Sequence, residues 1–369
     1  MAPQTLHASL PPFPPVPSAP LVSVRLGALE AGDPSALEAL WDAARGLGFF
    51  YLDMLGSELG EAIVAEAEQL NQLQERFWSL PNAEKDRYGR PHLHDFFAYR
   101  FGEIEEKDEN GDKIRNQNYN PRLCSDFQIR KDDVLGLTPR LACPPMILEA
   151  QALLASYMRH CHAVMDLLFM HLTTLLGLPP NTLLDLHKLE SRSGDHVRFT
   201  RSPVQPFDEG TARRGEHTDF GSLTLLFNWL GGLQIRTPDT HQWVYVKPVP
   251  GSPIVNLGDA MVTFTAGLLR SNIHRVVPPP PPQDALPRSS LVYFCRPEDD
   301  VVLRRLTGGI IDDQPVSESN EPEMTAQEWW MKRGTGQLPG IFTKKGFEPF
   351  VGGGDVYAGQ SAQAAKAGA

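Results

Sequence analysis

The chain has 369 residues, of which 41% are hydrophobic and 21% are charged, and its formal net charge is −11. This length suits one large β-rich domain with helical additions, and the apolar content is sufficient for a substantial core. The negative charge argues against nucleic acid or an anionic membrane as a partner, because both repel an acidic protein.

The first half of the chain is expected to be mainly helical. A proline-rich arm comes first, since the prolines of 11–17 favour a stiff, extended linker. Asp33 stands where a helix N-cap is needed, directly before Pro34, which a first turn tolerates. Farther along, apolar residues from Ile63 to Leu73 recur every three or four positions, as on one face of a helix. The predicted helices cover 34–47, 59–80, 146–177 and 325–333.

The second half favours strands, from 191 to about 305, in short apolar runs that contain β-branched residues. Five prolines at 278–282 predict a rigid connection, because proline lacks the donor that a strand ladder needs. The fold class is therefore expected to be mainly β with α additions. The expected organisation is an arm at 1–20, a helical and mixed region at 21–190, a β core at 191–305, a helical segment at 306–350 and a flexible tail at 351–369.

The sequence carries no signal for export or membrane insertion. No apolar run has membrane-spanning length, and the first residues lack the basic start and apolar stretch of a signal peptide. Four cysteines lie far apart and form no CxxC pair. We therefore expect free thiols and a cytoplasmic protein, as a monomer or a dimer. The cysteines are Cys124, Cys143, Cys161 and Cys295.

Three side chains between 217 and 274 suggest a metal site. His217 and Asp219 are two residues apart, and residues two apart in an extended stretch point to the same face. His274 lies in another apolar run and would complete the set from a neighbouring strand. Two imidazoles and one carboxylate form the facial set that holds ferrous iron and leaves coordination positions open.

A fourth candidate group is the cation of Arg288. An arginine presents a forked pair of donors that suits a carboxylate. Arg288 and Ser290 alternate along one apolar run, so both are expected on the same face of a strand. Together with the metal set, they suggest an iron oxygenase that consumes a 2-oxo acid.

Residues 197–297 resemble the catalytic half of the isopenicillin N synthase-like, 2-oxoglutarate and iron(II)-dependent dioxygenases. The likeness extends over about 22–300 but is strong only in the second half. It implies a double-stranded β-helix, also called a jelly roll and cupin-like, with flanking helices and with iron at the mouth of the barrel. The matching pieces are His217-Thr-Asp219, Gly232-Leu-Gln234, Trp243, Asn256-x-Gly258-Asp259, Ser271-x-x-His274 and Arg288-x-Ser290.

Carried over residue by residue, the resemblance makes His217, Asp219 and His274 the iron ligands. It also makes Arg288 and Ser290 the grip on the distal carboxylate of 2-oxoglutarate. The implied enzyme uses iron(II), 2-oxoglutarate and dioxygen to hydroxylate, desaturate or rearrange a small organic molecule, in keeping with secondary metabolism.

Two alternative functions stay open at this point. Relatives that do not use 2-oxoglutarate share the Arg-x-Ser pair, so an iron oxidase that cyclises or fragments its own substrate is one alternative. The other is a non-catalytic module that binds a small molecule. The chain also departs from the family at Ser202, where many members have tyrosine. Arg198 or Arg201 could take over that role, or this corner faces a different substrate.

Further polar residues complete the candidates. Asn256 or Asp259 is a candidate partner that orients the two histidine ligands. His92 and His94 could form a second metal site if extended, although no further ligand stands near them in the sequence. Two other histidines, at 160 and 162, lie in a predicted helix, where a spacing of two separates them by about 200°, so joint ligation is not expected.

Overall fold

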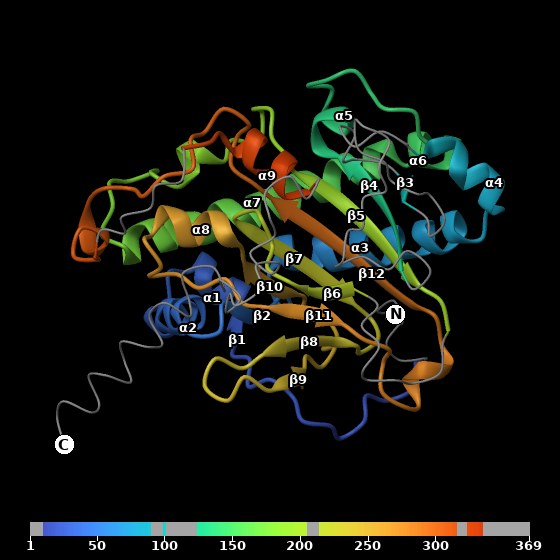
Figure 1. Cartoon of the computed structure of the whole chain (residues 1–369), viewed down its shortest axis with the longest axis horizontal. Helices are drawn as coiled ribbons and strands as arrows, with labels where there is room; N and C mark the ends of the chain where they lie inside the picture. The colour runs from blue at the N-terminus through green and yellow to red at the C-terminus, as the bar shows by residue number, and fades with distance from the viewer. Residues whose placement is uncertain (1–9, 90–98, 101–123, 205–213, 316–322, 335–369) are drawn as a thin grey trace, which may run out of the picture.

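A computed structural model describes residues 10–89, 99–100, 124–204, 214–315 and 323–334 (Figure 1). Within these residues the strands form an eight-stranded sheet, in the order β1-β2-β10-β7-β12-β5-β4-β3, and a four-stranded sheet, in the order β6-β11-β8-β9. The large sheet contains β1 (Ser23–Arg25), β2 (Phe49–Asp53), β3 (Tyr99–Arg100), β4 (Ser125–Arg130), β5 (His196–Ser202), β7 (Leu223–Asn228), β10 (Ile254–Leu257) and β12 (Arg288–Cys295); the small sheet contains β6 (Arg214–His217), β8 (Leu233–Arg236), β9 (Trp243–Tyr245) and β11 (His274–Val276).

The strands from β5 to β12 form the jelly roll. Four of them, β10, β7, β12 and β5, are adjacent in the large sheet, and the other four make up the small sheet. Every pairing among these eight strands is antiparallel. The expected fold class is confirmed: a double-stranded β-helix core, with β1 to β4 extending the large sheet at both edges.

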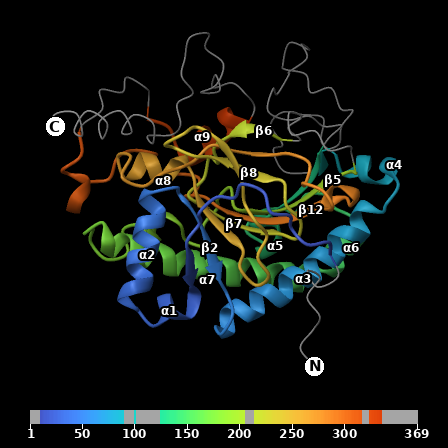
Figure 2. The ribbon, with the colours of Figure 1, turned by 90° about the horizontal axis from the view of Figure 1, so that it is seen from below.

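Two long helices, α3 (Glu58–Trp78) and α7 (Gln151–Leu175), pack against the large sheet. Figure 2 shows them on one side of this sheet, with β8 on the other. The alternation of β12 explains the arrangement, because every second side chain meets the helices and the others face the small sheet. The helix-facing residues Leu291, Tyr293 and Cys295 are all fully buried in the main core.

The helix boundaries agree with the sequence predictions to within a few residues. Asp33 caps α2 (Pro34–Arg45), since its carboxylate accepts hydrogen bonds from the backbone amides of the next turn at 2.9 and 3.1 Å. The helix expected over 146–177 is divided at Ala150 into α6 (Pro145–Glu149) and α7. Near the C-terminal end of the described chain, α9 runs from Ala326 to Gly334.

The proline-rich arm does not behave as a free linker over residues 10–20. The amide of Ala19 donates to the carbonyl of Tyr245 at 2.7 Å, next to an isolated bridge from Ser18 to the same residue. The Phe13 ring meets the Tyr245 ring edge-on, with centroids 6.4 Å apart. The carbonyl of Pro17 in turn accepts from the amide of Tyr245 at 2.9 Å, so this part of the arm runs along the edge strand β9.

The remaining expectations concern the proline run, the cysteines, membrane spans, the C-terminal tail and the pair His92 and His94. The prolines of 278–282 connect β11 and β12 without forming a strand, and all four cysteines are free thiols. None of the helices among the described residues combines the length and apolarity needed to span a bilayer. The tail at 351–369 and the pair His92 and His94 lie outside the described residues.

Candidate metal centre

The three candidate ligands come together at one end of the small sheet. His217 is the last residue of β6, His274 is the first of β11, and their Cα atoms are paired across the two strands. Asp219 lies two residues beyond the end of β6, in the loop that leads to β7. Asp219 is thus not part of β6, but its carboxylate meets the two imidazoles as expected from the spacing.

The geometry of this group suits a shared cation. One ligand atom from each of His217, Asp219 and His274 lies within 4.8 Å of the others. The two imidazole centroids are 4.2 Å apart, and the Nε2 of His274 is 3.9 Å from the Oδ1 of Asp219. These separations leave room for an ion at ordinary bond lengths of about 2 Å from each donor.

Hydrogen bonds fix the orientation of two of the three candidates. The other oxygen of Asp219, Oδ2, accepts from the amide of Asn256 at 2.7 Å and from the hydroxyl of Thr224 at 3.1 Å. The Nδ1 of His274 lies 3.1 Å from the carbonyl of Asn272. Because a carbonyl only accepts, Nδ1 carries the proton, and the lone pair of the neutral ring is left on Nε2.

The electrostatics keep Asp219 ionised. Burial alone would raise its pKa, but the neighbouring His274 and His217, together with the hydrogen bond from Asn256, outweigh that effect and hold the pKa at about 2. The carboxylate is therefore anionic at neutral pH. A donor set of two imidazoles and one carboxylate reduces the charge of a bound divalent ion to a single positive charge.

Asn256 and Asp259 both border the site. Asn256 orients Asp219 through its hydrogen bond to Oδ2. Asp259 accepts from the hydroxyl of Thr218 at 2.9 Å, and its backbone amide donates to the carbonyl of Asp219 at 2.8 Å. These contacts hold the loop that contains Thr218 and Asp219, so they fix the position of the carboxylate, while the carbonyl of Asn272 orients the imidazole of His274.

Arg333, another residue near this loop, was not predicted from the sequence. Its guanidinium pairs with Asp259 and lies over the Phe220 ring at 5.2 Å. Arg333 is on α9, 74 positions from its partner. No local periodicity connects residues so far apart, and so sequence reasoning missed it.

Arg288 and Ser290 lie on the inner face of the large sheet. Arg288 is 1% exposed, and its Nε donates to the carbonyl of Gly231 at 2.8 Å. Across the pairing of β12 with β7, Ser290 is opposite Asn228, and Phe294 is opposite Thr224. Directly paired residues share a face of the sheet. Since Thr224 hydrogen-bonds Asp219, the arginine, the serine and the metal group all face the interior of the roll.

The two arginines proposed to replace the family tyrosine at Ser202 point to opposite sides of β5. Arg201 pairs with Glu75 on α3 and donates to the hydroxyl of Ser289 at 2.8 Å, so it faces the helices. Arg198 is buried over the ring of Phe294 at 4.3 Å, and its charge helps lower the pKa of Asp219. Of the two, only Arg198 shares the face of the candidate site.

The comparisons with known proteins agree with this geometry. Residues 194–297 match the family described as the 2OG-Fe(II) oxygenase superfamily. A 2-oxoglutarate-dependent dioxygenase of Aspergillus fumigatus is 26% identical over 344 residues, which cover 86% of each chain. Another, from a Dothideomycetidae species, is 27% identical over 292 residues, covering 78% of this chain and 85% of the relative.

Solved structures give the same fold. A complex of Neurospora crassa T7H with alpha-KG aligns with a TM-score of 0.70 at 22% identity, covering 86% of this chain and 96% of that one. A rice dioxygenase for auxin oxidation aligns with a TM-score of 0.58 at 22% identity, covering 86% and 96%. The matched family and the named relatives lead to one conclusion: residues 194–297 form a domain of the 2OG-Fe(II) oxygenase superfamily, and the protein is an oxidoreductase that uses iron(II), 2-oxoglutarate and dioxygen.

Proposed function

We propose that His217, Asp219 and His274 hold the iron(II) of this oxygenase. The observation that carries the proposal is the convergence of two imidazoles and one carboxylate within 4.8 Å. Their donor types fit ferrous iron, and three ligands leave positions for the co-substrate and dioxygen. With these bound, the metal supplies oxidative decarboxylation of 2-oxoglutarate coupled to oxidation of a second molecule.

Arg288 and Ser290 are the proposed grip on the distal carboxylate of 2-oxoglutarate. Support comes from the burial of both side chains, at 1% and 4% exposed, and from their position on the same face as Thr224 and Asp219. A guanidinium held by the carbonyl of Gly231 through Nε presents its two terminal nitrogens as a fork, which matches a carboxylate.

The primary substrate is proposed to be a small organic molecule, which would be hydroxylated, desaturated or rearranged in a secondary pathway. Solved relatives are named for such molecules: T7H was crystallised with thymine, and the rice protein is a dioxygenase for auxin oxidation. The protein itself positions and orients the reactants and excludes water from the interior of the roll.

The test is stoichiometric. Metal-free protein should bind one equivalent of iron(II) at this centre under anaerobic conditions, and aerobic turnover of a metabolite library with 2-oxoglutarate should release one succinate per oxidised substrate. Oxidation of a substrate without any succinate would overturn the proposed role of Arg288 and Ser290. Normal iron binding by His274→Ala would overturn the ligand assignment. His241→Asn is a suitable control, because His241 is exposed and has a backbone φ of 54° that asparagine tolerates.

A further inference from the structure

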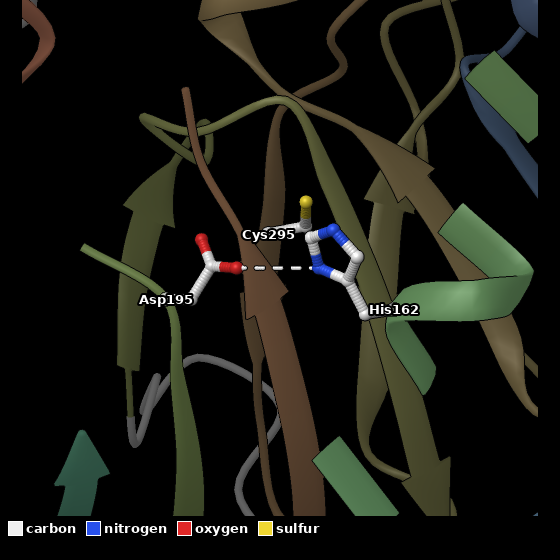
Figure 3. Close-up of side chains that lie close together, drawn as sticks. All are labelled: His162, Asp195 and Cys295. Carbon is white, nitrogen blue, oxygen red and sulfur yellow. Dashed lines mark ion pairs between the residues drawn. The ribbon is translucent and has the colours of Figure 1, made fainter. Parts of the chain in front are cut away.

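A second group of metal-binding side chains lies on the other face of the large sheet, between the sheet and α7. His162 extends from α7 toward Asp195, which directly precedes β5, and Cys295 ends β12 beside them (Figure 3). Their ligand atoms lie within 4.8 Å of one another, and all three residues are buried. Any metal here would be independent of the proposed iron centre.

The space between these three residues is already filled by hydrogen bonds. Asp195 accepts from the backbone amide of Arg296 at 2.7 Å through one oxygen and from the hydroxyl of Tyr293 at 3.1 Å through the other. Burial raises the pKa of the Cys295 thiol well above its usual range. A cation here would have to break the hydrogen bond from Tyr293 to Asp195 and deprotonate a thiol whose pKa is raised. The space between His162, Asp195 and Cys295 is therefore unsuitable for a metal ion.

These inner contacts determine which nitrogen of His162 carries a proton. The hydroxyl of Tyr293 gives its single proton to Asp195, and its oxygen therefore accepts from the Nδ1 of His162, 3.1 Å away. The neutral ring then has its lone pair on Nε2. A histidine that donates its other N–H toward a carboxylate is the arrangement usually seen behind a metal-binding imidazole.

The other ring nitrogen, Nε2, is buried, and His162 is among the residues that line a cavity of about 330 Å³. The side chain is only 3% exposed, and among the described residues this nitrogen has no hydrogen-bond partner. The nearest charged atom is the Oδ1 of Asp166, one helical turn along α7, at 3.5 Å. Two further acids, Asp185 and Glu190, line the same cavity, as do Arg159 and Lys188.

The two cationic side chains are directed at other partners. Lys188 donates to the carbonyl of Asp185 at 3.0 Å and lies 3.6 Å from Glu298, and Arg159 donates to the carbonyl of Ala155. Burial lowers the pKa of His162, but Asp195 and Asp166 outweigh that effect and raise it overall. When the ring is neutral, His162 and Asp166 face each other as two electron-pair donors. Two donors bound at about 2.1 Å to one tetrahedral ion are about 3.4 Å apart. The observed 3.5 Å separation matches that spacing.

We propose that this cavity binds a divalent transition-metal ion of the zinc type through the Nε2 of His162 and the carboxylate of Asp166, with Glu190 adding negative charge to the lining of the cavity. The mixed nitrogen and oxygen donors suit zinc better than calcium or magnesium. The ion would join two successive turns of α7. Its role would be structural, because it lies behind the sheet and not in the interior of the roll.

Calorimetric titration of the metal-free full chain with zinc sulfate tests the proposal. The wild type should bind two equivalents, since zinc also competes for the iron ligands. Asp166→Asn should lose one of them, or bind it more than about tenfold more weakly, while His274→Ala should lose the other. Asp166 is half-exposed, so this change should leave the fold intact; Glu190→Gln, at an exposed position, provides a second test if it does not. Asp42→Asn, on the exposed face of α2, is the matched control.

The outcomes separate this proposal from that for the iron centre. Loss of one equivalent in Asp166→Asn, with 2-oxoglutarate turnover retained by the iron-loaded protein, supports the second site. A single equivalent in the wild type that disappears in His274→Ala would overturn it, as would two equivalents that persist in both Asp166→Asn and Glu190→Gln. If the wild type binds a single equivalent, the 3.5 Å separation is that of an ion pair between protonated His162 and Asp166.

Discussion

Two groups of histidine and acidic residues lie on opposite faces of the same large sheet. At one end of the small sheet, His217 and His274 meet Asp219 across two paired strands and a loop. Behind the sheet, His162 and Asp195 meet Cys295 under α7. The two groups have similar compositions and similarly close ligand atoms, yet their surroundings differ.

The difference is in what already occupies the donor atoms. Asp219 uses Oδ2 for its two hydrogen bonds and turns Oδ1 toward His274. Asp195 uses both oxygens, one for Arg296 and one for Tyr293. A cluster of metal-binding residue types is therefore not a sufficient sign of a metal site. The lone pairs must also face a shared space that an ion can enter.

The difference between the two groups is tested most directly by removing one candidate ligand from each of them. Changing His217, Asp219 or His274 to alanine should abolish succinate release, because two remaining donors do not hold the iron in its facial arrangement. Anaerobic iron titration and a coupled succinate assay measure the effect. Near-full activity in any of these variants would refute that ligand.

Asp195→Ala should reduce the stability of the protein without affecting iron binding. It leaves buried partners of Asp195 unpaired, so the free energy of unfolding should fall by about 3–5 kcal/mol, while iron still binds with unchanged stoichiometry. Urea unfolding measures the first quantity and calorimetry the second. Asp185→Asn, at an exposed position, is the control. A stable Asp195→Ala protein that has lost iron would reverse the roles of the two groups.

Arg288→Ala tests the inner face away from the metal. The loss of a charge-assisted contact worth roughly 1.5–3 kcal/mol should raise the KM for 2-oxoglutarate by about ten- to over a hundredfold, with a much smaller change for the main substrate. Steady-state kinetics with each substrate varied in turn measures both. Arg201→Ala, on the helix-facing side of β5, should leave the KM for 2-oxoglutarate unchanged. Equal effects on both substrates would count against the proposed grip.

Asn256→Ala addresses the orientation of a single ligand. Without its 2.7 Å hydrogen bond, Asp219 should turn more freely, and iron affinity should fall by about 10–100-fold. Competition with a calibrated chelator gives the dissociation constant. Asn82→Ala, on the exposed helix α4 (Asn82–Lys85), should have no effect. An unchanged affinity in Asn256→Ala would mean that Thr224 alone fixes the carboxylate.

Much of the fold was predictable because its signals are local. The Asp33 cap and the apolar spacing from Ile63 to Leu73 each depend on residues within a few turns of one another, and both predicted helices are present. Strand patterns after 191 likewise indicated the β core. The separation of His160 and His162 is confirmed too, since His160 contacts Glu66 and His162 contacts Tyr293.

The amino-acid sequence by itself determined which residue types are available to hold a metal and roughly which segments carry them. Only the tertiary structure decided that β6 and β11 are neighbours with His217 opposite His274, that Arg198 turns inward while Arg201 turns outward, and that the arm runs along β9. The physical reason is that strand pairing and side-chain direction depend on contacts between distant parts of the chain. Local periodicity gives the face of a single strand, but not the partner that this face meets.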